Sequence, residues 1–292
     1  MTNQPTSHYI ECAGREIHFM EWGANHAQTV IAWHGLARTG RDMDELAAHL
    51  SSEHGYRVLC PDTIGRGLSQ WSPEPKDEYR LTFYARIAAD FCDRVGVDRA
   101  HWIGTSMGGA LGMVCASGLI EPAMKPRIRS LVLNDTAPEV AQAAVERIRS
   151  YAGSPPAFAT VVELEAFFRQ VYKPYGALTD AQWRRLTETS TRRLPDGRVT
   201  PHYDPAMVGQ FVHYPNDYLI WNHYDQIEVP TLCLRGIDSD LVKRETLTAM
   251  AQRGPGTRGL LETVEVSGCG HAPALNVPEH FKLITQFLSK QE

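Results

Sequence analysis

The most constraining feature of the sequence is an alternation of buried strands and amphipathic helices that a long helical block interrupts. Apolar runs predict strands at residues 29–33, 56–60, 99–103, 128–133, 230–235 and 260–266. Apolar residues at helical spacing between these runs predict the helices that connect parallel strands by right-handed crossovers. From Pro138 to about Ile227 no buried strand is evident, and several helices are expected instead. The sequence therefore predicts a parallel α/β sheet that carries a helical insertion.

The same pattern defines the expected ends and domains of the fold. Residues 8–22 alternate around Gly14-Arg15, which predicts an antiparallel hairpin at the start of the chain. A length of 292 residues allows a sizeable core. We expect this core to comprise residues 1–137 and 228–292, and residues 138–227 to form a helical cap, or lid.

Composition and charge narrow the class of protein. A hydrophobic content of 43% and a charged content of 22% are ordinary for a soluble globular enzyme. The net charge of −5 gives no electrostatic reason to expect nucleic acid or an anionic membrane as partner. The longest apolar runs are strand-length, and the first residues lack a secretory signal pattern. Six cysteines without a Cys-x-x-Cys pair predict reduced, buried thiols. These features favour a cytoplasmic protein without a nucleic-acid or membrane partner, and neither a metal nor a cofactor is expected.

A serine motif lies at the turn after one predicted strand. The sequence Gly104-Thr105-Ser106-Met107-Gly108 follows the apolar run 99–103 and precedes a segment of small residues typical of a helix. A serine at the apex of such a turn exposes its hydroxyl, and the flanking glycines let the backbone cross closely. The five-residue pattern alone is weak evidence, but its position between a strand and a helix strengthens it.

Other reactive side chains follow neighbouring strands at the same edge of the predicted sheet, where ligands bind in open parallel sheets. Asp238 and Asp240 follow the strand 230–235, and His271 follows the strand 260–266. A serine hydroxyl needs a neutral imidazole to accept its proton, and a carboxylate to orient that imidazole. We therefore predict Ser106 as nucleophile and His271 as base.

An oxyanion hole would complete this chemistry, because two N–H groups must face the oxygen on which charge develops. The residue after the nucleophile supplies one of them, which predicts the backbone N–H of Met107. The loop after the first parallel strand, His34-Gly35-Leu36, supplies the other, which predicts the backbone N–H of Leu36.

These stretches together resemble the α/β-hydrolase family over nearly the whole chain. More narrowly, they resemble a bacterial esterase-like subgroup with a helical cap, similar to intracellular 3-hydroxybutyrate-oligomer hydrolases. The resemblance rests on six segments: His34-Gly35-Leu36-Ala37-Arg38, Gly65-Arg66-Gly67-Leu68-Ser69, Gly104-Thr105-Ser106-Met107-Gly108-Gly109, Leu133-Asn134-Asp135, Arg235-Gly236 with Ser239-Asp240, and Gly270-His271-Ala272-Pro273. It implies a mostly parallel eight-stranded sheet flanked by helices, and hydrolysis of carboxylic esters.

The resemblance also bears on the acid. The subgroup pattern of Arg-Gly, two residues, then Ser-Asp implies that the acid is Asp240. Many relatives place the acid three residues after the glycine, and this chain has Ser239 there. Asp238 and Asp135 remain alternatives. The resemblance further implies that His34 shapes the oxyanion loop and takes no part in catalysis.

Several interpretations stay open at the level of sequence. Arg38 and Arg66 either hold a substrate carboxylate or support loops. The expected substrates are short-chain or hydroxyacid esters, whereas a lactonase, a hydrolase of carbon–carbon bonds and a perhydrolase are alternatives on the same fold. A non-catalytic ligand-binding protein on this scaffold is the alternative of another class. A serine instead of an aspartate at the turn disfavours a dehalogenase or an epoxide hydrolase.

Overall fold

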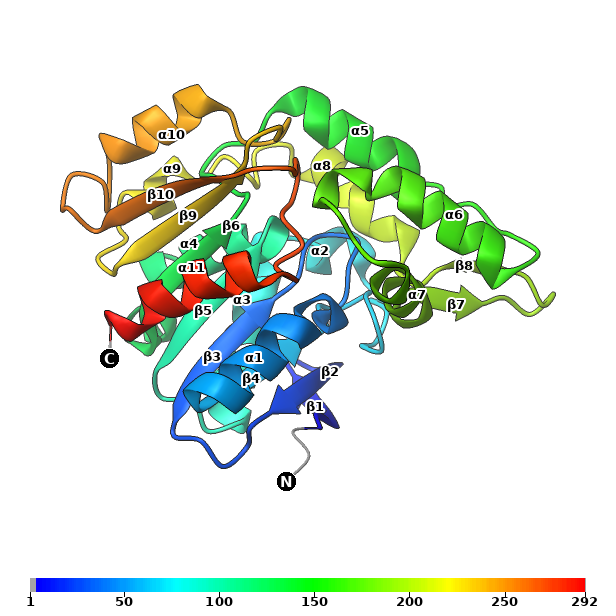
Figure 1. The fold of residues 1–292 in the computed structure, drawn as a ribbon, viewed down its shortest axis with the longest axis horizontal. Helices are drawn as coiled ribbons and strands as arrows, with labels where there is room; N and C mark the ends of the chain where they lie inside the picture. The colour runs from blue at the N-terminus through cyan, green and yellow to red at the C-terminus, as the bar shows by residue number, and fades with distance from the viewer. Residues whose placement is uncertain (1–3, 292) are drawn as a thin grey trace.

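A computed structural model describes residues 4–291, which form one eight-stranded sheet with helices on both faces (Figure 1). The strand order is β1-β2-β4-β3-β5-β6-β9-β10. The strands are β1 (Thr6–Cys12), β2 (Arg15–Trp22), β3 (Gln28–Trp33), β4 (Tyr56–Pro61), β5 (Ala100–Thr105), β6 (Ile128–Asn134), β9 (Thr231–Gly236) and β10 (Leu261–Val266). Within this sheet, only the β1–β2 and β2–β4 pairings are antiparallel. The predicted mostly parallel sheet and the opening hairpin are thus confirmed.

Alternate side chains of each central strand bury against different helices, as the two-residue period of a strand requires. In β3, Val30 and Ala32 pack into a core with helices α1 (Asp44–His54) and α11 (Pro278–Ser289). Ile31 and Trp33 pack on the opposite face with α3 (Leu81–Arg94) and α4 (Met107–Ser117). Because both faces are covered, the central strands are apolar throughout. The remaining helices outside residues 138–227 are short or peripheral: α2 (Pro75–Glu78), α10 (Arg244–Ala251), η1 (Gly40–Met43) and η2 (Pro122–Arg127).

Residues 138–227, hereafter the inserted segment, lie between β6 and β9 and extend beside the sheet (Figure 1). Their elements are α5 (Gln142–Ala152), α6 (Val161–Val171), η3 (Lys173–Tyr175), α7 (Asp180–Thr189), β7 (Thr191–Arg193), β8 (Val199–Pro201), η4 (Pro205–Gly209), α8 (Gln210–His213) and α9 (Trp221–Tyr224). The β7–β8 hairpin differs from the expectation of helices alone. Its strands are only three residues long, so they carry no alternation that a sequence pattern could reveal.

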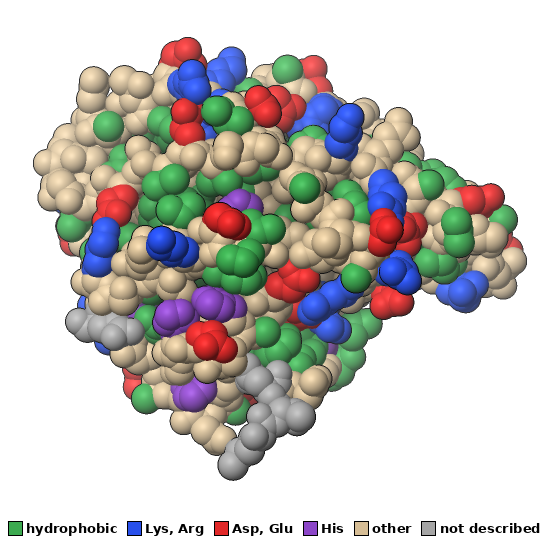
Figure 2. Space-filling model, in the orientation of Figure 1, with side chains coloured by type: hydrophobic (Ala, Val, Ile, Leu, Met, Phe, Trp, Pro, Cys, Tyr) green, Lys and Arg blue, Asp and Glu red, His purple; other side chains and the backbone are tan. Residues whose placement is uncertain are grey.

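The inserted segment has its own small core and is anchored to the sheet domain by ion pairs. Phe168 of α6 and Trp183 of α7 pack together in that core. Arg185 of α7 binds the buried Asp44 at the start of α1 at 2.5 Å. Acidic and basic side chains intermingle over the outside of this segment in Figure 2. The inserted segment therefore keeps its own packed core while it is attached beside the sheet.

The strand register brings the ends of four strands level at one edge of the sheet. Thr105 of β5 pairs with Asn134 of β6, which in turn pairs with Leu234 of β9. Gly236 of β9 pairs with Val266 of β10. The residues that follow these strands therefore emerge side by side, as parallel strands require.

Replacement of Gly108 by alanine tests the close packing behind this edge. An added Cβ would lie 2.3 Å from the Trp33 carbonyl oxygen, so the backbone of α4 or β3 must shift. We expect Gly108→Ala to lower the free energy of unfolding by about 3 kcal/mol, the upper range for overpacking. The measurement is chemical denaturation followed by circular dichroism. Gly35→Ala is the matched control, since its nearest contact would be an ordinary 3.7 Å. Equal losses in both variants would contradict this account.

Candidate active site

Ser106 lies at the apex of a strained turn between β5 and α4. Its φ of 52° and ψ of −115° fall outside the regions that residues with a side chain usually adopt. Glycine makes the turn possible, because a Cβ at Gly104 would lie 2.2 Å from the Gly108 carbonyl oxygen. The Ser106 N–H donates to the Asn134 carbonyl at 2.9 Å, which fixes the turn against β6. The predicted strand–turn–helix geometry is present, and Ser106 and His271 line one chamber.

His271 faces a buried carboxylate. Its Nδ1 lies 2.7 Å from Oδ2 of Asp135, the residue directly after β6. Asp135 is fully buried, and it also accepts hydrogen bonds from the Gly236 N–H at 2.9 Å and the Ser239 hydroxyl at 2.7 Å. Because a carboxylate oxygen accepts hydrogen bonds, Nδ1 of His271 is assigned as the donor to Asp135, and Nε2 is left outside this contact.

The prediction that Asp240 is the carboxylate partner of His271 is wrong. Asp240 is about half exposed, with 49% of its side-chain surface accessible, and it forms a two-pronged ion pair with Arg147 of α5 at 2.7 and 3.0 Å. Asp238 borders a surface cleft with His271 but forms no hydrogen bond to it within residues 4–291. Of the three candidate carboxylates, Asp135 is the one that lies beside the imidazole of His271.

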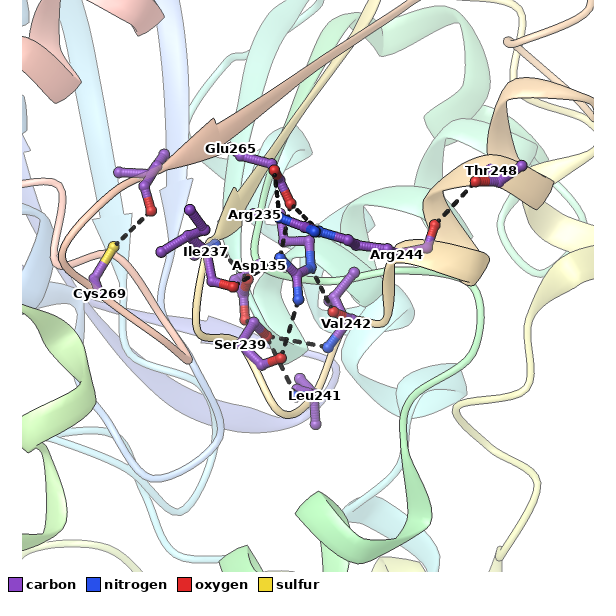
Figure 3. Close-up of polar contacts among 12 residues, drawn as sticks. Asp135, Arg235, Ile237, Ser239, Leu241, Val242, Arg244, Thr248, Glu265 and Cys269 are labelled. Atoms are coloured by element: carbon purple, nitrogen blue, oxygen red, sulfur yellow. Dashed lines mark hydrogen bonds and ion pairs between the residues drawn. The ribbon is translucent and has the colours of Figure 1, made fainter.

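Ser239 explains the misassignment (Figure 3). It stands three residues after Gly236, where the family pattern often has an acid, and its hydroxyl points to Asp135 instead. The same Oγ accepts from the N–H groups of Leu241 and Val242, which shapes the loop after β9. The loop thus supports the carboxylate of the neighbouring strand and directs Asp240 outward.

The loop after β3 presents one of the two expected oxyanion donors. Leu36 and Met107 both border the chamber that contains Ser106. Within residues 4–291, neither the Leu36 N–H nor the Met107 N–H donates a hydrogen bond. A Cβ added at Gly35 would lie 3.7 Å from Cβ of Ser106, so the loop passes directly over the serine. Two N–H groups without acceptors beside a hydroxyl are what an oxyanion hole needs, and the roles of Leu36 and Met107 stay predictions.

Buried polar residues hold this loop in place. Arg66, fully buried, donates to the Leu36 carbonyl at 2.8 Å and to the Tyr84 hydroxyl at 2.9 Å. Nε2 of His34 accepts from the Thr63 N–H at 2.9 Å, and its Nδ1 lies 2.6 Å from the Gly35 carbonyl. Burial lowers the pKa of His34 to about 4, so its imidazole stays neutral. These contacts assign loop support to both side chains, in agreement with the expectation for His34.

Two chambers of different character meet at Ser106. The apolar chamber is lined by Leu36, Ser106, Met107, Thr136, Val140, Val145, Ile148, Phe211, Tyr218 and Leu241. The arginine chamber is lined by Gly35, Leu36, Ala37, Arg38, Thr105, Ser106, Arg147, Ile148, Tyr151, Val171, Tyr172, Tyr175, His271 and Ala272. Residues of the inserted segment line both. Arg147 and the three tyrosines carried no sequence signal, because the helices that bear them have no motif.

Ionisable groups around the chambers are held in their ordinary protonation states. Burial raises the pKa of Tyr172 and Tyr175, so both phenols are uncharged at neutral pH and can donate hydrogen bonds. Burial also raises the pKa of Cys269 to about 11, which keeps this thiol beside His271 protonated. No group of side chains suited to holding a metal ion is found in residues 4–291. Ser106 and His271 supply the hydroxyl and the imidazole that line the arginine chamber.

Comparison with known proteins agrees with this architecture. Residues 28–276 match the family described as the alpha/beta hydrolase fold. A 3-hydroxybutyrate-oligomer hydrolase of Cupriavidus necator is 35% identical over 99% of both chains. An alpha/beta hydrolase from Novosphingobium aromaticivorans superimposes with a TM-score of 0.82 at 30% identity, covering 99% of this chain and all of its own. A putative hydrolase from Rickettsia typhi gives 0.86 at 24% identity, with the same coverage, and supports the fold alone.

The match to the family covers most of the chain, and one relative is similar from end to end. No helix within residues 4–291 is long and apolar enough to cross a membrane. The mostly parallel eight-stranded sheet and the strand–turn–helix at Ser106 are those expected of the resemblance. The chain belongs to the α/β-hydrolase fold family and is a hydrolase of that type.

Proposed function

We propose that the protein hydrolyses carboxylic esters through an acyl-enzyme on Ser106, with His271 as general base and acid and Asp135 as the orienting carboxylate. The observation that carries the proposal is the 2.7 Å contact between His271 Nδ1 and a buried carboxylate with three donors, in a chamber that Ser106 also lines. This contact leaves Nε2 as the free acceptor, which is the state a serine nucleophile requires.

The reaction then follows in two halves. Oγ of Ser106 attacks the ester carbonyl carbon while Nε2 of His271 takes the hydroxyl proton. The tetrahedral intermediate collapses, the bond to the alcohol oxygen breaks, and the imidazolium returns its proton to that oxygen. Water then attacks the acyl-enzyme with His271 again accepting the proton, and collapse releases the acid and restores Ser106.

Charge that develops during both halves needs fixed partners. The N–H groups of Leu36 and Met107 would stabilise the oxyanion, since both border the chamber and neither has another acceptor within residues 4–291. Asp135 would stabilise the imidazolium without taking its proton. Because Asp135 already holds three donors, it need not move when His271 becomes charged.

We propose short hydroxyacid esters, such as 3-hydroxybutyrate oligomers, as substrates. The relative from Cupriavidus necator carries that activity in its name and matches this chain over its full length. Two small chambers meeting at Ser106 suit a substrate with a compact group on each side of the ester. We further propose that residues 138–227 act as a cap over a core of residues 1–137 and 228–292, because they line both chambers. Six buried free cysteines favour a cytoplasmic setting.

Ser106→Ala tests the nucleophile. The substitution removes only the hydroxyl group. We expect hydrolysis of p-nitrophenyl butyrate to become undetectable, because the attacking oxygen is lost, and the thermal unfolding curve to stay close to that of the wild type. A fluorophosphonate probe should label the wild type at Ser106 and leave the variant unlabelled. Retention of most of the activity would show that the mechanism is wrong, whereas an inactive and unlabelled wild type would indicate a ligand-binding protein.

A pair of isosteric substitutions tests the orienting carboxylate. Asp135→Asn removes the acceptor of the His271 Nδ1 proton, and we expect kcat to fall roughly 10⁴-fold, as for loss of an orienting aspartate in this kind of triad. Asp240→Asn breaks only a half-exposed ion pair, and we expect a change within about fivefold. The measurement is steady-state hydrolysis of the same ester. A larger loss for Asp240→Asn than for Asp135→Asn would return the acid role to the loop after β9.

A further inference from the structure

The position of His271 determines which part of an ester lies in which chamber. His271 lines the arginine chamber and does not line the apolar chamber. The alcohol oxygen must come within hydrogen-bond reach of its Nε2 to receive the proton, about 3 Å. The leaving alcohol therefore occupies the arginine chamber, and the acyl group extends past Met107 into the apolar chamber. This step rests on the proposed function.

Arg38 is a cation buried beside that leaving group. Its side chain is 2% exposed, and its Nε and Nη2 bind Asp42 at 2.7 and 2.6 Å. The guanidinium lies over the ring of Tyr172, 4.7 Å from the ring centre. Nη1 is buried and has no hydrogen-bond partner among residues 4–291. A buried donor of a charged group without an acceptor is costly, so a ligand oxygen at this atom would be strongly favoured.

Arg38 also lies close to the serine. A Cβ placed on Gly35 would be 3.7 Å from Cβ of Ser106 and 3.9 Å from Cγ of Arg38, so both side chains border this glycine. In a 3-hydroxyacid the alcohol oxygen and the carboxylate are two carbons apart. Such a leaving group is short enough to place its oxygen at His271 and its carboxylate toward the guanidinium.

Arg147 adds a second positive charge at the outer side of the same chamber. It comes from α5 of the inserted segment, is 38% exposed, and is held by Asp240. Its Nε and Nη2 bind Asp240, which does not line the arginine chamber. The uncharged phenols of Tyr151, Tyr172 and Tyr175 line the chamber between the two arginines. No carboxylate lines the arginine chamber within the described residues.

We infer that the arginine chamber binds the free carboxylate of the leaving hydroxyacid and that Arg38 is the residue that recognises it. The enzyme then cleaves a hydroxyacid oligomer at the ester nearest its carboxylate end and releases one hydroxyacid at a time. The acyl-enzyme on Ser106 carries the remaining, uncharged part of the oligomer in the apolar chamber. Direction along the oligomer is thereby set by charge.

The charge recognition is tested with two substrates that differ only at the leaving carboxylate: the linear 3-hydroxybutyrate dimer and its terminal carboxamide. We expect the wild-type kcat/KM to favour the acid by roughly 10- to 100-fold, the range for a hydrogen bond to a charged group. Arg38→Met should bring this ratio close to one, and Arg38→Lys should restore part of it. Because the ratio compares two substrates on the same folded enzyme, partial loss of fold does not change it.

Arg185→Met is the matched control. Arg185 has the same 38% exposure as Arg147 and also bridges the inserted segment to an aspartate, but it does not line the arginine chamber. Its acid-to-amide ratio should equal that of the wild type, whereas Arg147→Met should lower the ratio by a few-fold. An unchanged ratio in Arg38→Met would overturn the role of Arg38.

The direction of cleavage is tested with a trimer deuterated only in its carboxylate-end unit. After rapid quenching, intact mass spectrometry should show two unlabelled units on Ser106, and the first monomer released should be deuterated. A one-unit adduct or an unlabelled first monomer would overturn the inferred direction. Equal cleavage of acid and amide dimers would overturn the inference while the proposed hydrolase function stands. Cleavage of p-nitrophenyl butyrate but of neither dimer would reject the hydroxyacid substrate class.

Discussion

The site depends on one buried carboxylate that three donors share. Asp135 receives hydrogen bonds from His271, from the Ser239 hydroxyl and from the backbone of Gly236, so the ends of β6, β9 and β10 meet at one charged group. A charge buried this completely is stable only while all its donors are present. The loops that bring the imidazole into place therefore form one electrostatic unit, and none of them can rearrange without leaving the carboxylate short of a donor.

Much of the fold was predictable because it obeys local rules. The apolar runs that became β3, β5 and β9 are buried on both faces, which gives an unbroken hydrophobic signal. The direction of the crossover connections between these strands was predictable because such connections between parallel strands are almost always right-handed. The β7–β8 hairpin was not predictable, because three-residue strands carry no periodicity. The division of labour within the inserted segment was equally hidden, since α5 contributes Arg147 and Tyr151 through tertiary placement and not through a motif.

The residues of the site also differ in how far local sequence patterns predict them. The positions of Ser106 and His271 after their strands were predictable, and the structure brings both residues to one chamber. The carboxylate beside His271 was not predictable in this way. Motif spacing compares acidic residues within the loop after β9, whereas the carboxylate that contacts His271 comes from the loop after β6. Ser239 is the decisive residue: its hydroxyl binds Asp135 and its loop turns Asp240 toward Arg147. The pattern that identifies this carboxylate is an acid directly after β6 combined with a serine in the loop after β9. Because the two residues lie far apart in the sequence, no single motif contains both.

The glycines around Ser106 have a consequence for how such a protein can diversify. Gly104 and Gly108 bring the backbones of β5, α4 and β3 into direct contact, and Gly109 packs against the Thr136 side chain, so a larger residue at these positions around Ser106 would force neighbouring atoms to shift. Substitutions there are costly for folding, whereas about half of the residues that line the two chambers come from residues 138–227, which have a separate core. Substitutions in the insertion can therefore alter the substrate range while the turn at Ser106 stays unchanged.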